Sequence, residues 1–561
     1  MKKIIYLFTI LMVFIAVSGC KDYLEVEPET EFTNDNFWTS ESNLESFSYG
    51  LYENFKGYGN GGFFGGDHFF SVNNDDVIGL DQRLELDFPT TVPATVSGSH
   101  WGWSNIRKAN VLITETQKAS LDATIQDKYV GVGRFFRALL YWDKVRRYGD
   151  VPFYDKPVDP DDEHALFAAR TPMVDVVNNI VADLDFAIAH LPDSYDKTKV
   201  TKWTALALKS RVCLSAATTF KYHNVAGADV NKLLNESVAA STELMNANFS
   251  LSDSYSALFY SEDLSSNPEV ILMKKYNENM KHPIPSFIFQ EPFFGFSNSA
   301  VSSFLMADGK PIHYDGAAHP GYTEWTFNTT DTITTADNAI QVNVGIANGR
   351  DGRMSQIIDT TRLVAPFSKG IPMFSPIKYA DYDLTVHAPK QGVEATTDAP
   401  IFRLGEVLLN FAEAKAELGS ITQADLDNSI NLLRARAGVA PLSMNVGFDA
   451  DDRDPSVDAL LWEIRRERRV ELMLEPFRKW DLLRWAKGSY YDADNSFYGV
   501  KVAPTVPFAS SITVLKDAEG HLYAQEPGDR RTPWDDRKYW EPIPADQLTL
   551  NKNLTQNPGW D

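Results

Sequence analysis

Tryptophan and tyrosine side chains beside polar residues mark two places where a ligand could bind. Trp101 and Trp103 stand directly before Ser104. Tyr322 and Trp325 lie in a stretch rich in glycine, threonine and histidine. Their rings can stack on the flat C–H faces of a sugar, and neighbouring amide, carboxylate and guanidinium groups can bind its hydroxyls. The candidate ligand-binding residues are Trp101, Trp103, Asn73, Asn74, Asp75, Arg83, Tyr322 and Trp325.

Packing in a core is the alternative role for each of these rings, since large aromatic side chains are more often buried than bound to a ligand. The chain also lacks common catalytic motifs. None of its ten histidines forms H-E-x-x-H, and no G-x-S-x-G elbow occurs. Acidic pairs are expected by chance among 76 acids, and a glycosidase is defined by a separation in space that sequence does not give. We therefore expect no enzyme, no cofactor and no metal.

A glycine-rich stretch at 57–62 formally matches G-x-G-x-x-G. A dinucleotide site would need a buried strand before it and a helix that begins at it. Here Phe63 and Phe64 follow, and no strand–helix–strand pattern is present. We interpret the stretch as an aromatic loop.

A dense run of charges occupies residues 463–475. Apolar residues at Leu460, Ile464 and Leu472 recur with helical spacing, which predicts a packed helix with a charged flank. A structural network of ion pairs is favoured over a catalytic cluster. Its predicted members are Glu467, Arg468, Glu471, Glu475, Arg478, Asp481 and Arg484.

Residues 1–19 have the pattern of a secretory signal. Two lysines precede an apolar run from Ile4 to Val17, which is shorter than a membrane span, and small residues lead to Cys20. The string V-S-G-C resembles the bacterial lipoprotein box, and this resemblance implies that Cys20 becomes the lipidated first residue. The other cysteine, Cys213, falls in an apolar helical pattern typical of an inert core thiol, so we expect no disulfide.

The composition is strongly acidic. The chain has 53 basic and 76 acidic residues and a formal net charge of −23. Nucleic acids and anionic membrane surfaces require a basic footprint, so this charge argues against both as ligands. It suits an exported protein that binds neutral solutes.

Amphipathic helices are predicted in neighbouring pairs. Gly419 is expected to end one helix, and Thr422 with Asp425 to cap the next. Such pairs are similar to tetratricopeptide-type hairpins, of which about four fit, and a helical bundle without repeats is the alternative. The predicted helices span 101–117, 121–147, 172–190, 203–220, 230–245, 401–418, 422–438 and 454–475.

Two stretches, residues 251–400 and residues 488–561, differ from the helical parts. Residues 251–400 are rich in glycine, proline, asparagine and threonine, with short predicted strands at 270–273 and 340–344. Long irregular stretches in a compact protein are usually functional. We expect a single unit over 20–561, with a helical scaffold at roughly 101–250 and 401–487, a loop-rich ligand-binding insertion at roughly 251–400 and a C-terminal loop region at 488–561.

Five motifs follow one another in a recognisable order. Residues 401–414 read I-F-R-L-G-E-V-L-L-N-F-A-E-A, and residues 430–438 read I-N-L-L-R-A-R-A-G. Residues 465–485 read R-R-E-R-R-V-E-L-M-L-E-P-F-R-K-W-D-L-L-R-W. An R-D-G-R turn lies within 348–354, and W-E-P-I-P begins a tail that ends in Q-N-P-G-W at residue 560. These motifs resemble those of the SusD/RagB family, with Gly352 where the family has proline.

The resemblance implies a mainly α fold, in which tetratricopeptide-like hairpins pack against an irregular loop-rich region with short strands. It implies a cell-surface glycan-binding lipoprotein that captures oligosaccharides and delivers them to a SusC-like TonB-dependent transporter. The chain would be anchored in the outer membrane through Cys20, and Lys21-Asp22 resembles a tag for export to the outer face. Because W-x-W-S-N-I-R-K-A-N is similar to the start of a family helix, Trp101 and Trp103 are the leading stacking candidates.

Two other readings stay open. One branch of the same family takes peptides, so a peptide-binding member is the first alternative. A glycoside hydrolase is the second, on the abundance of carboxylates alone. Asn73, Asn74 and Asp75 match a family loop only loosely, and Tyr322 and Trp325 rest on their residue types.

Overall fold

The computed structural model describes most of the chain after the signal segment. Cys20, Asn73 and Arg83 lie outside the described residues. In the described part, no helix combines the length and the apolar character needed to cross a bilayer. The described residues are 37–59, 66, 74–79, 88–285, 294–333, 339–341, 345–364, 374–380, 394–492, 496, 498–510, 515–523 and 534–561.

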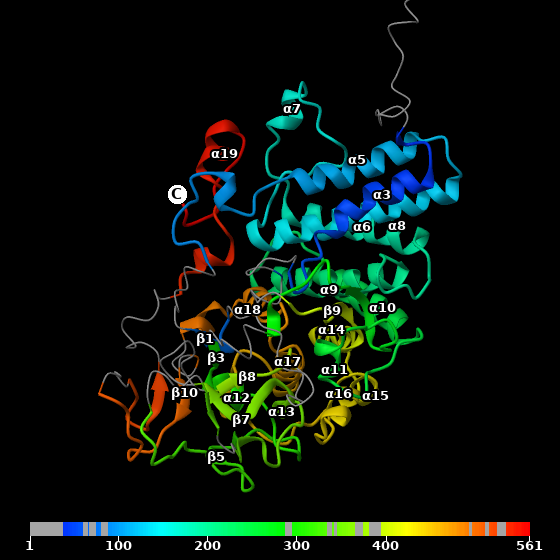
Figure 1. The fold of residues 1–561 in the computed structure, drawn as a ribbon. Coiled ribbons are helices and arrows are strands. Elements are labelled where there is room, and N and C mark those ends of the chain that lie inside the picture. Colours follow the sequence, from blue (N-terminus) through cyan, green and yellow to red (C-terminus); the bar gives the residue numbers. More distant parts are fainter. Residues whose placement is uncertain are drawn as a thin grey trace, which may run out of the picture.

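Long helices stacked side by side form the scaffold (Figure 1). Each packs on the next in the order α5, α6, α8, α9, α10 and α14, and α3 lies across α5 and α6. The predicted mainly helical fold is confirmed. These helices are α3 (Glu41–Tyr52), α5 (Ser104–Lys118), α6 (Ala123–Tyr148), α8 (Met173–His190), α9 (Lys202–Tyr222), α10 (Val230–Met245) and α14 (Leu404–Glu417).

Apolar spacing and caps account for these helices. In α8, the buried residues Val177, Ile180 and Leu184 recur every three or four positions on one face. Asp122 caps α6, because its carboxylate accepts a hydrogen bond from the Thr124 amide at 2.8 Å. Gly419 adopts a positive φ of 68° after α14, where a glycine costs least. Cys213 is fully buried in the core of α9, as the sequence predicts.

Three predicted helix boundaries near the C-terminal third are wrong. Residues 401–403 belong to strand β9 (Ala399–Arg403), which pairs antiparallel with β2 (Val270–Lys274) before α14 begins. The predicted helix 422–438 is two helices, α15 (Gln423–Asp427) and α16 (Ile430–Ala437), and the predicted box of Thr422 with Asp425 caps the first. The predicted helix 454–475 begins late, as α17 (Ala459–Glu471).

The end of α17 has a local backbone cause. Leu474 adopts a positive φ of 63°, a conformation that no helix continues. The chain turns there and enters a separate short helix, α18 (Arg478–Arg484).

A second core lies below the scaffold in Figure 1, around a five-stranded sheet. The strand order is β1-β3-β8-β7-β6, with antiparallel neighbours. The predicted strand 270–273 is confirmed as β2; of 340–344, residues 340–341 are in β6 and the rest lie outside the described residues. The sheet strands are β1 (Val77–Gly79), β3 (Phe294–Phe296), β6 (Ala339–Gln341), β7 (Ile358–Val364) and β8 (Phe374–Pro376).

Short elements complete the described chain. Most lie in the two stretches that the sequence predicts to be loop-rich. They are α7 (Glu163–Leu166), α11 (Ala257–Tyr260), α12 (Asn298–Ser302), α13 (Met354–Ile357), α19 (Ala545–Leu550), β4 (His313–Tyr314), β5 (Ala317–Ala318), β10 (Tyr498–Lys501), β11 (His521–Tyr523) and the 3₁₀ turns at Val96–Gly98, Gly345–Ala347, Gly488–Asp492 and Asp536–Tyr539.

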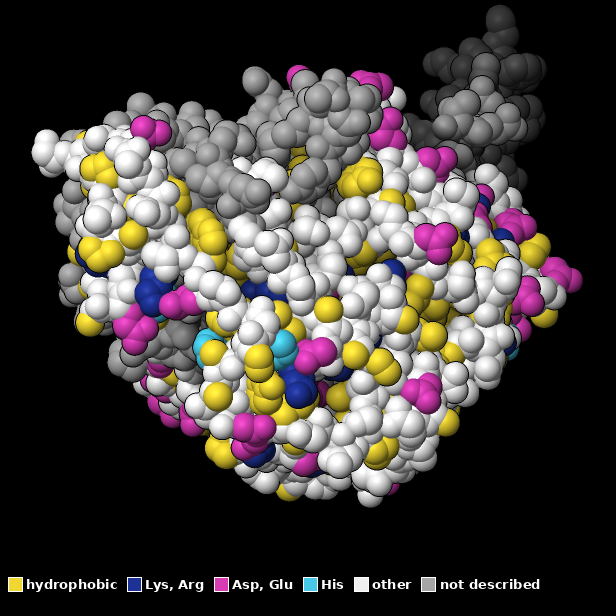
Figure 2. Space-filling view, turned by 90° about the horizontal axis from the view of Figure 1, so that it is seen from below, with side chains coloured by type: hydrophobic (Ala, Val, Ile, Leu, Met, Phe, Trp, Pro, Cys, Tyr) yellow, Lys and Arg dark blue, Asp and Glu magenta, His cyan; other side chains and the backbone are white. Residues whose placement is uncertain are grey.

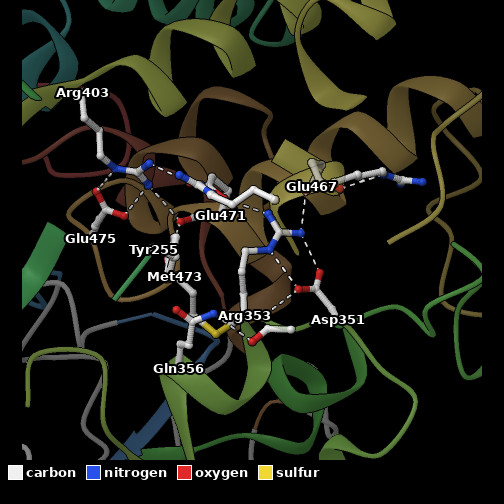
Figure 3. Close-up of polar contacts among 12 residues, drawn as sticks. Tyr255, Asp351, Arg353, Gln356, Arg403, Glu467, Glu471, Met473 and Glu475 are labelled. Carbon is white, nitrogen blue, oxygen red and sulfur yellow. Dashed lines mark hydrogen bonds and ion pairs between the residues drawn. The ribbon is translucent and has the colours of Figure 1, made fainter. Parts of the chain in front are cut away.

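A buried network of ion pairs joins the scaffold to the second core (Figure 3). Arg353 contacts Glu467 at 2.7 Å and Glu471 at 2.8 Å. Arg403 contacts Glu471 and Glu475, each at 2.7 Å. Burial alone would raise the pKa of Glu475, but Arg403 and Lys378 lower it to about 2. The charged run at 463–475 is therefore structural, as predicted.

Candidate functional site

A groove of about 1210 Å³ lies where distant parts of the chain meet. One wall is residues 88–106, including the start of α5, and another is the last two turns of α6. Strand β9 and helices α9 and α18 line it further, and residues 539–542 of the C-terminal tail close one side. Its volume suits an oligosaccharide-sized ligand.

The last two turns of α6 set four charged side chains into the groove. Asp143 accepts from Arg146 at 2.6 Å and from Arg147 at 3.2 Å, at the i+3 and i+4 spacing of a helix. Arg147 also contacts Glu541 of the tail at 2.7 Å. Lys144 donates from Nζ to the carbonyl oxygen of His100. Arg147 and Glu541 are 394 residues apart in the sequence, so this cluster joins two distant segments of the chain.

Trp480 of α18 lies against this cluster. The guanidinium carbon of Arg146 is 4.0 Å from its ring centroid, and that of Arg147 is 5.0 Å away. Such cation–π contacts hold an aromatic ring in a fixed orientation. Lys479 Nζ lies 4.4 Å from the ring of Phe88 on the facing wall. Further aromatic residues of the lining are Phe55, Trp142, Phe402, Phe477, Tyr539 and Trp540.

The structure corrects the stacking role predicted for Trp101. Its side chain is 1% exposed, and its ring packs edge-on against Tyr148 and Trp103 with centroid distances of 4.8 and 5.4 Å. Trp103 is half-buried beside Trp101 and Tyr154, with a ring distance of 5.6 Å to the latter. The neighbours Gly102, Ser104 and Asn105 do line the groove. The predicted segment therefore reaches the site, while the Trp101 ring belongs to the core.

The polar candidate residues near the N-terminus have different surroundings in the structure. Asp75 is 1% exposed, and its two carboxylate oxygens each accept from Arg478 at 2.7 Å. This bidentate pair fixes α18 and leaves no free oxygen for a sugar, so the predicted binding role of Asp75 is corrected to a structural one. Asn74 lines the groove, and its side-chain oxygen accepts from the Asp76 amide at 2.7 Å. Asn73 and Arg83 lie outside the described residues.

Tyr322 and Trp325 are not brought to the groove. Tyr322 is half-buried, with its ring centroid 5.6 Å from that of His313. Trp325 is half-buried against the second core beside Phe327. The face below that core shows apolar side chains in small groups separated by polar ones (Figure 2). The two predicted sets of aromatic residues thus lie in separate regions.

Sequence reasoning missed Trp480, Tyr539 and Trp540. Trp480 stands within F-R-K-W-D-L-L-R-W, a stretch after the predicted helix whose charged residues were assigned to the structural ion-pair network. Pro476 is the signal that could have indicated its separate position. A proline disrupts a helix, so the stretch after Pro476 need not continue α17. No local signal brings Tyr539 and Trp540 to the same groove, because that contact depends on the path of the tail.

Several ionisable groups of the groove have shifted pKa values. Burial opposes ionisation of Glu541, but Arg147 and His100 lower its pKa to about 2. Arg147 and Arg146 likewise hold the pKa of Asp143 below its usual range despite burial. Burial, aided by Arg147, lowers the pKa of Lys144 to about 8. Among the described residues, no three His, Cys, Asp or Glu side chains are grouped so that they could hold a metal ion.

Comparison with known proteins identifies the family. The pattern of the SusD family matches residues 290–560. A second pattern, described as starch-binding associating with outer membrane, matches residues 22–214. The chain belongs to the SusD family. Two SusD-like proteins of Formosa agariphila are each 24% identical to it; the alignments cover 86% and 87% of this chain and 89% and 92% of theirs.

Solved SusD-like structures share the fold. A SusD-like carbohydrate-binding protein of Bacteroides fragilis superimposes with a TM-score of 0.71 at 20% identity, over 92% of this chain and 100% of that one. A laminarin-binding SusD-like protein gives a TM-score of 0.57 at 19% identity, over 93% of this chain and 100% of that one. The predicted SusD-like fold is therefore confirmed.

Proposed function

We propose that this SusD-family protein is a glycan-binding protein of the cell surface and that the groove is its binding site. The observation that carries the proposal is a groove of about 1210 Å³ that is lined by aromatic rings, by backbone and hydroxyl groups, and by lysine and arginine side chains. Sugar rings stack on aromatic faces, and their hydroxyls accept and donate hydrogen bonds. The carbohydrate-binding neighbours of the same fold support this choice of ligand class.

Binding without hydrolysis fits the carboxylates of the groove. A glycosidase needs one carboxyl group that stays protonated near neutral pH, which requires a raised pKa. Glu475 and Glu541 each have a pKa lowered to about 2 by neighbouring cations, and that of Asp143 is also lowered. These groups stay ionised, so they suit the orientation of cations rather than proton transfer.

The proposal extends to location and transport. We propose that Cys20 carries a lipid anchor in the outer membrane, with the folded body exposed at the surface, and that the captured oligosaccharide passes to a SusC-like TonB-dependent transporter. The match to a pattern associated with the outer membrane supports the location. Co-purification of the lipidated protein with such a transporter would support the partnership, and separate elution under mild detergent would contradict it.

The test of ligand class is an array that holds oligosaccharides and peptides, probed with the chain that begins after Cys20. Binding to at least one glycan is expected, and Trp480→Ala should lower that affinity about tenfold because a stacking face is lost. Trp203→Ala is the matched control, since Trp203 is half-buried against Tyr195 and lies outside the groove. Binding to peptides alone would favour the peptide-binding branch, and loss of affinity in both variants would rule out the groove as the specific site.

A further inference from the structure

The groove carries a surplus of positive charge in an otherwise acidic protein. Its lining includes ten Lys or Arg side chains and five Asp or Glu side chains. The whole chain shows the opposite balance, with 53 basic and 76 acidic residues. A low-dielectric cleft lined by one sign of charge concentrates ligands of the other sign.

Part of that surplus is structural. Arg403, Arg468 and Arg484 are each 3% exposed or less and contact the carboxylates of Glu269, Asp481 and Glu413, respectively. Arg478 is held by Asp75 at 2.7 Å, and Arg211 by Glu406 at 2.6 Å. These side chains are already neutralised by partners and add little to the potential that a ligand meets.

Five Lys or Arg side chains of the lining remain, namely Lys56, Lys144, Arg146, Arg147 and Lys479. The last four lie beside His100 or Trp480, and together with His100 they form a cluster that we call the basic ledge. Only Asp143 and Glu541 oppose it among the described groove-lining residues nearby. The His100 side chain is 56% exposed and that of Arg146 is 29% exposed, so a ligand can reach both. Trp480 lies beside Arg146 and Lys479, with 5.4 Å from the Lys479 Nζ to its ring centroid.

Within the ledge, Lys144 is the side chain whose surroundings most favour an added anion. The residue is 7% exposed, and its Nζ donates to the carbonyl oxygen of His100. It forms no ion pair with a carboxylate in the part of the chain that the structure describes. Burial and the nearby Arg147 disfavour its charged form, and its pKa falls to about 8. A buried cation in this state gains most from an added anion.

We infer that the basic ledge binds the anionic substituent of an acidic oligosaccharide, a carboxylate of a uronic acid or a sulfate ester, while Trp480 stacks on the sugar ring that carries it. The inference rests on the proposed function and specifies its substrate class. It differs from the neutral solute that the composition predicts, because net charge sums the whole surface whereas a ligand responds to the local potential.

Calorimetric titration of the chain that begins after Cys20 tests the inference with three probes. They are a galacturonic acid tetrasaccharide, a sulfated carrageenan tetrasaccharide and the neutral laminaritetraose. At least one acidic probe is expected to bind about tenfold more tightly than the neutral one, with an affinity that falls as salt is added. The two acidic probes distinguish a carboxylate from a sulfate ester.

Lys479→Gln removes one half-buried cation of the ledge and should lower affinity for the acidic probe about fivefold, with the neutral probe unchanged. Lys118→Gln is the matched control, because its side chain is 65% exposed and ends α5 far from the groove. Neutral and acidic probes that bind equally, with no effect of Lys479→Gln, would overturn this inference and leave the proposed function standing. Binding of no glycan at all would overturn both.

Discussion

The ion-pair network of Figure 3 and the basic ledge use the same residue types in opposite ways. In the network, Arg353 and Arg403 are 1% and 3% exposed in their side chains and meet several carboxylates each. In the ledge, cations outnumber carboxylates, and His100 and Arg146 are open to solvent. Balanced charge in the interior joins segments of the fold, whereas unbalanced charge at a groove remains available for a ligand.

This difference lies in the number of partners rather than in the amino acids. Glu471 accepts hydrogen bonds from Arg353, Arg403 and Arg436, so both of its carboxylate oxygens are paired with buried arginines. Lys144 has a carbonyl oxygen as its acceptor. Four measurements test this difference between the network and the ledge.

Glu471→Gln should cause the largest loss of stability. The substitution removes the charge that neutralises three buried arginines, and breaking a buried ion pair from one side costs about 3–5 kcal/mol. Urea unfolding followed by circular dichroism measures this loss. A decrease below about 1 kcal/mol would show that the network does not hold the two cores together.

Acid should weaken the buried ion pairs. The pKa values of Glu413 and Glu475 are lowered from the ordinary 4.5 to about 2. A lowered pKa gives stability that is present above the unfolded pKa and lost as pH falls through the folded pKa, at about 3 kcal/mol for each group. The free energy of unfolding should therefore fall steadily between about pH 4.5 and 2, and a flat profile there would contradict the assigned pairs.

Alkali should weaken the ledge. Burial and the nearby Arg147 lower the pKa of Lys144 to about 8, although Asp143 and Glu541 oppose this shift. The charge of Lys144 is therefore lost as pH rises through that value. Affinity for the acidic tetrasaccharide should fall about fivefold between about pH 7 and 9, while affinity for the neutral one stays constant. Lys144→Met should remove this pH dependence, and an unchanged profile in that variant would exclude Lys144 as its source.

Glu324→Gln should have the smallest effect. Glu324 pairs with Lys501 at 2.6 Å, but its side chain is 50% exposed. Exposed pairs contribute about 0–1 kcal/mol, because water screens them and the side chains lose freedom. Thermal unfolding of this variant beside Glu471→Gln compares one substitution in two surroundings. A loss equal to that of Glu471→Gln would show that burial is not the deciding factor.

Much of the fold follows from local pattern. The apolar spacing of residues 172–190 predicts α8 to within one residue, because a helix needs only one continuous apolar face. The errors fall where a local signal competes with a distant partner. Residues 401–403 read as helix but form β9, since their backbone groups pair with β2, more than a hundred residues earlier.

The candidate site was predictable only in part. The segment around Trp101, which the sequence predicts to bind a ligand, contributes Gly102, Ser104 and Asn105 to the lining of the groove. The ring itself packs on Tyr148, a contact that no local spacing reveals. Trp480 lies among residues that the sequence assigns to the ion-pair network, yet its ring lines the groove beside Arg146.

Ordered motifs identified the family, and local spacing gave most of the helices, the cap at Thr422 and the members of the ion-pair network within residues 467–484, because each depends on residues near one another. Arg353 and Arg403 complete the network only in the folded chain, since they lie 118 and 68 residues from Glu471 in the sequence. The tertiary structure alone decided which rings and charges meet a ligand. Exposure and pairing arise when α6, α18 and the tail come together, as Arg147, Trp480 and Glu541 do. Composition sums the charges of the chain, and only packing determines which charges lie beside one another.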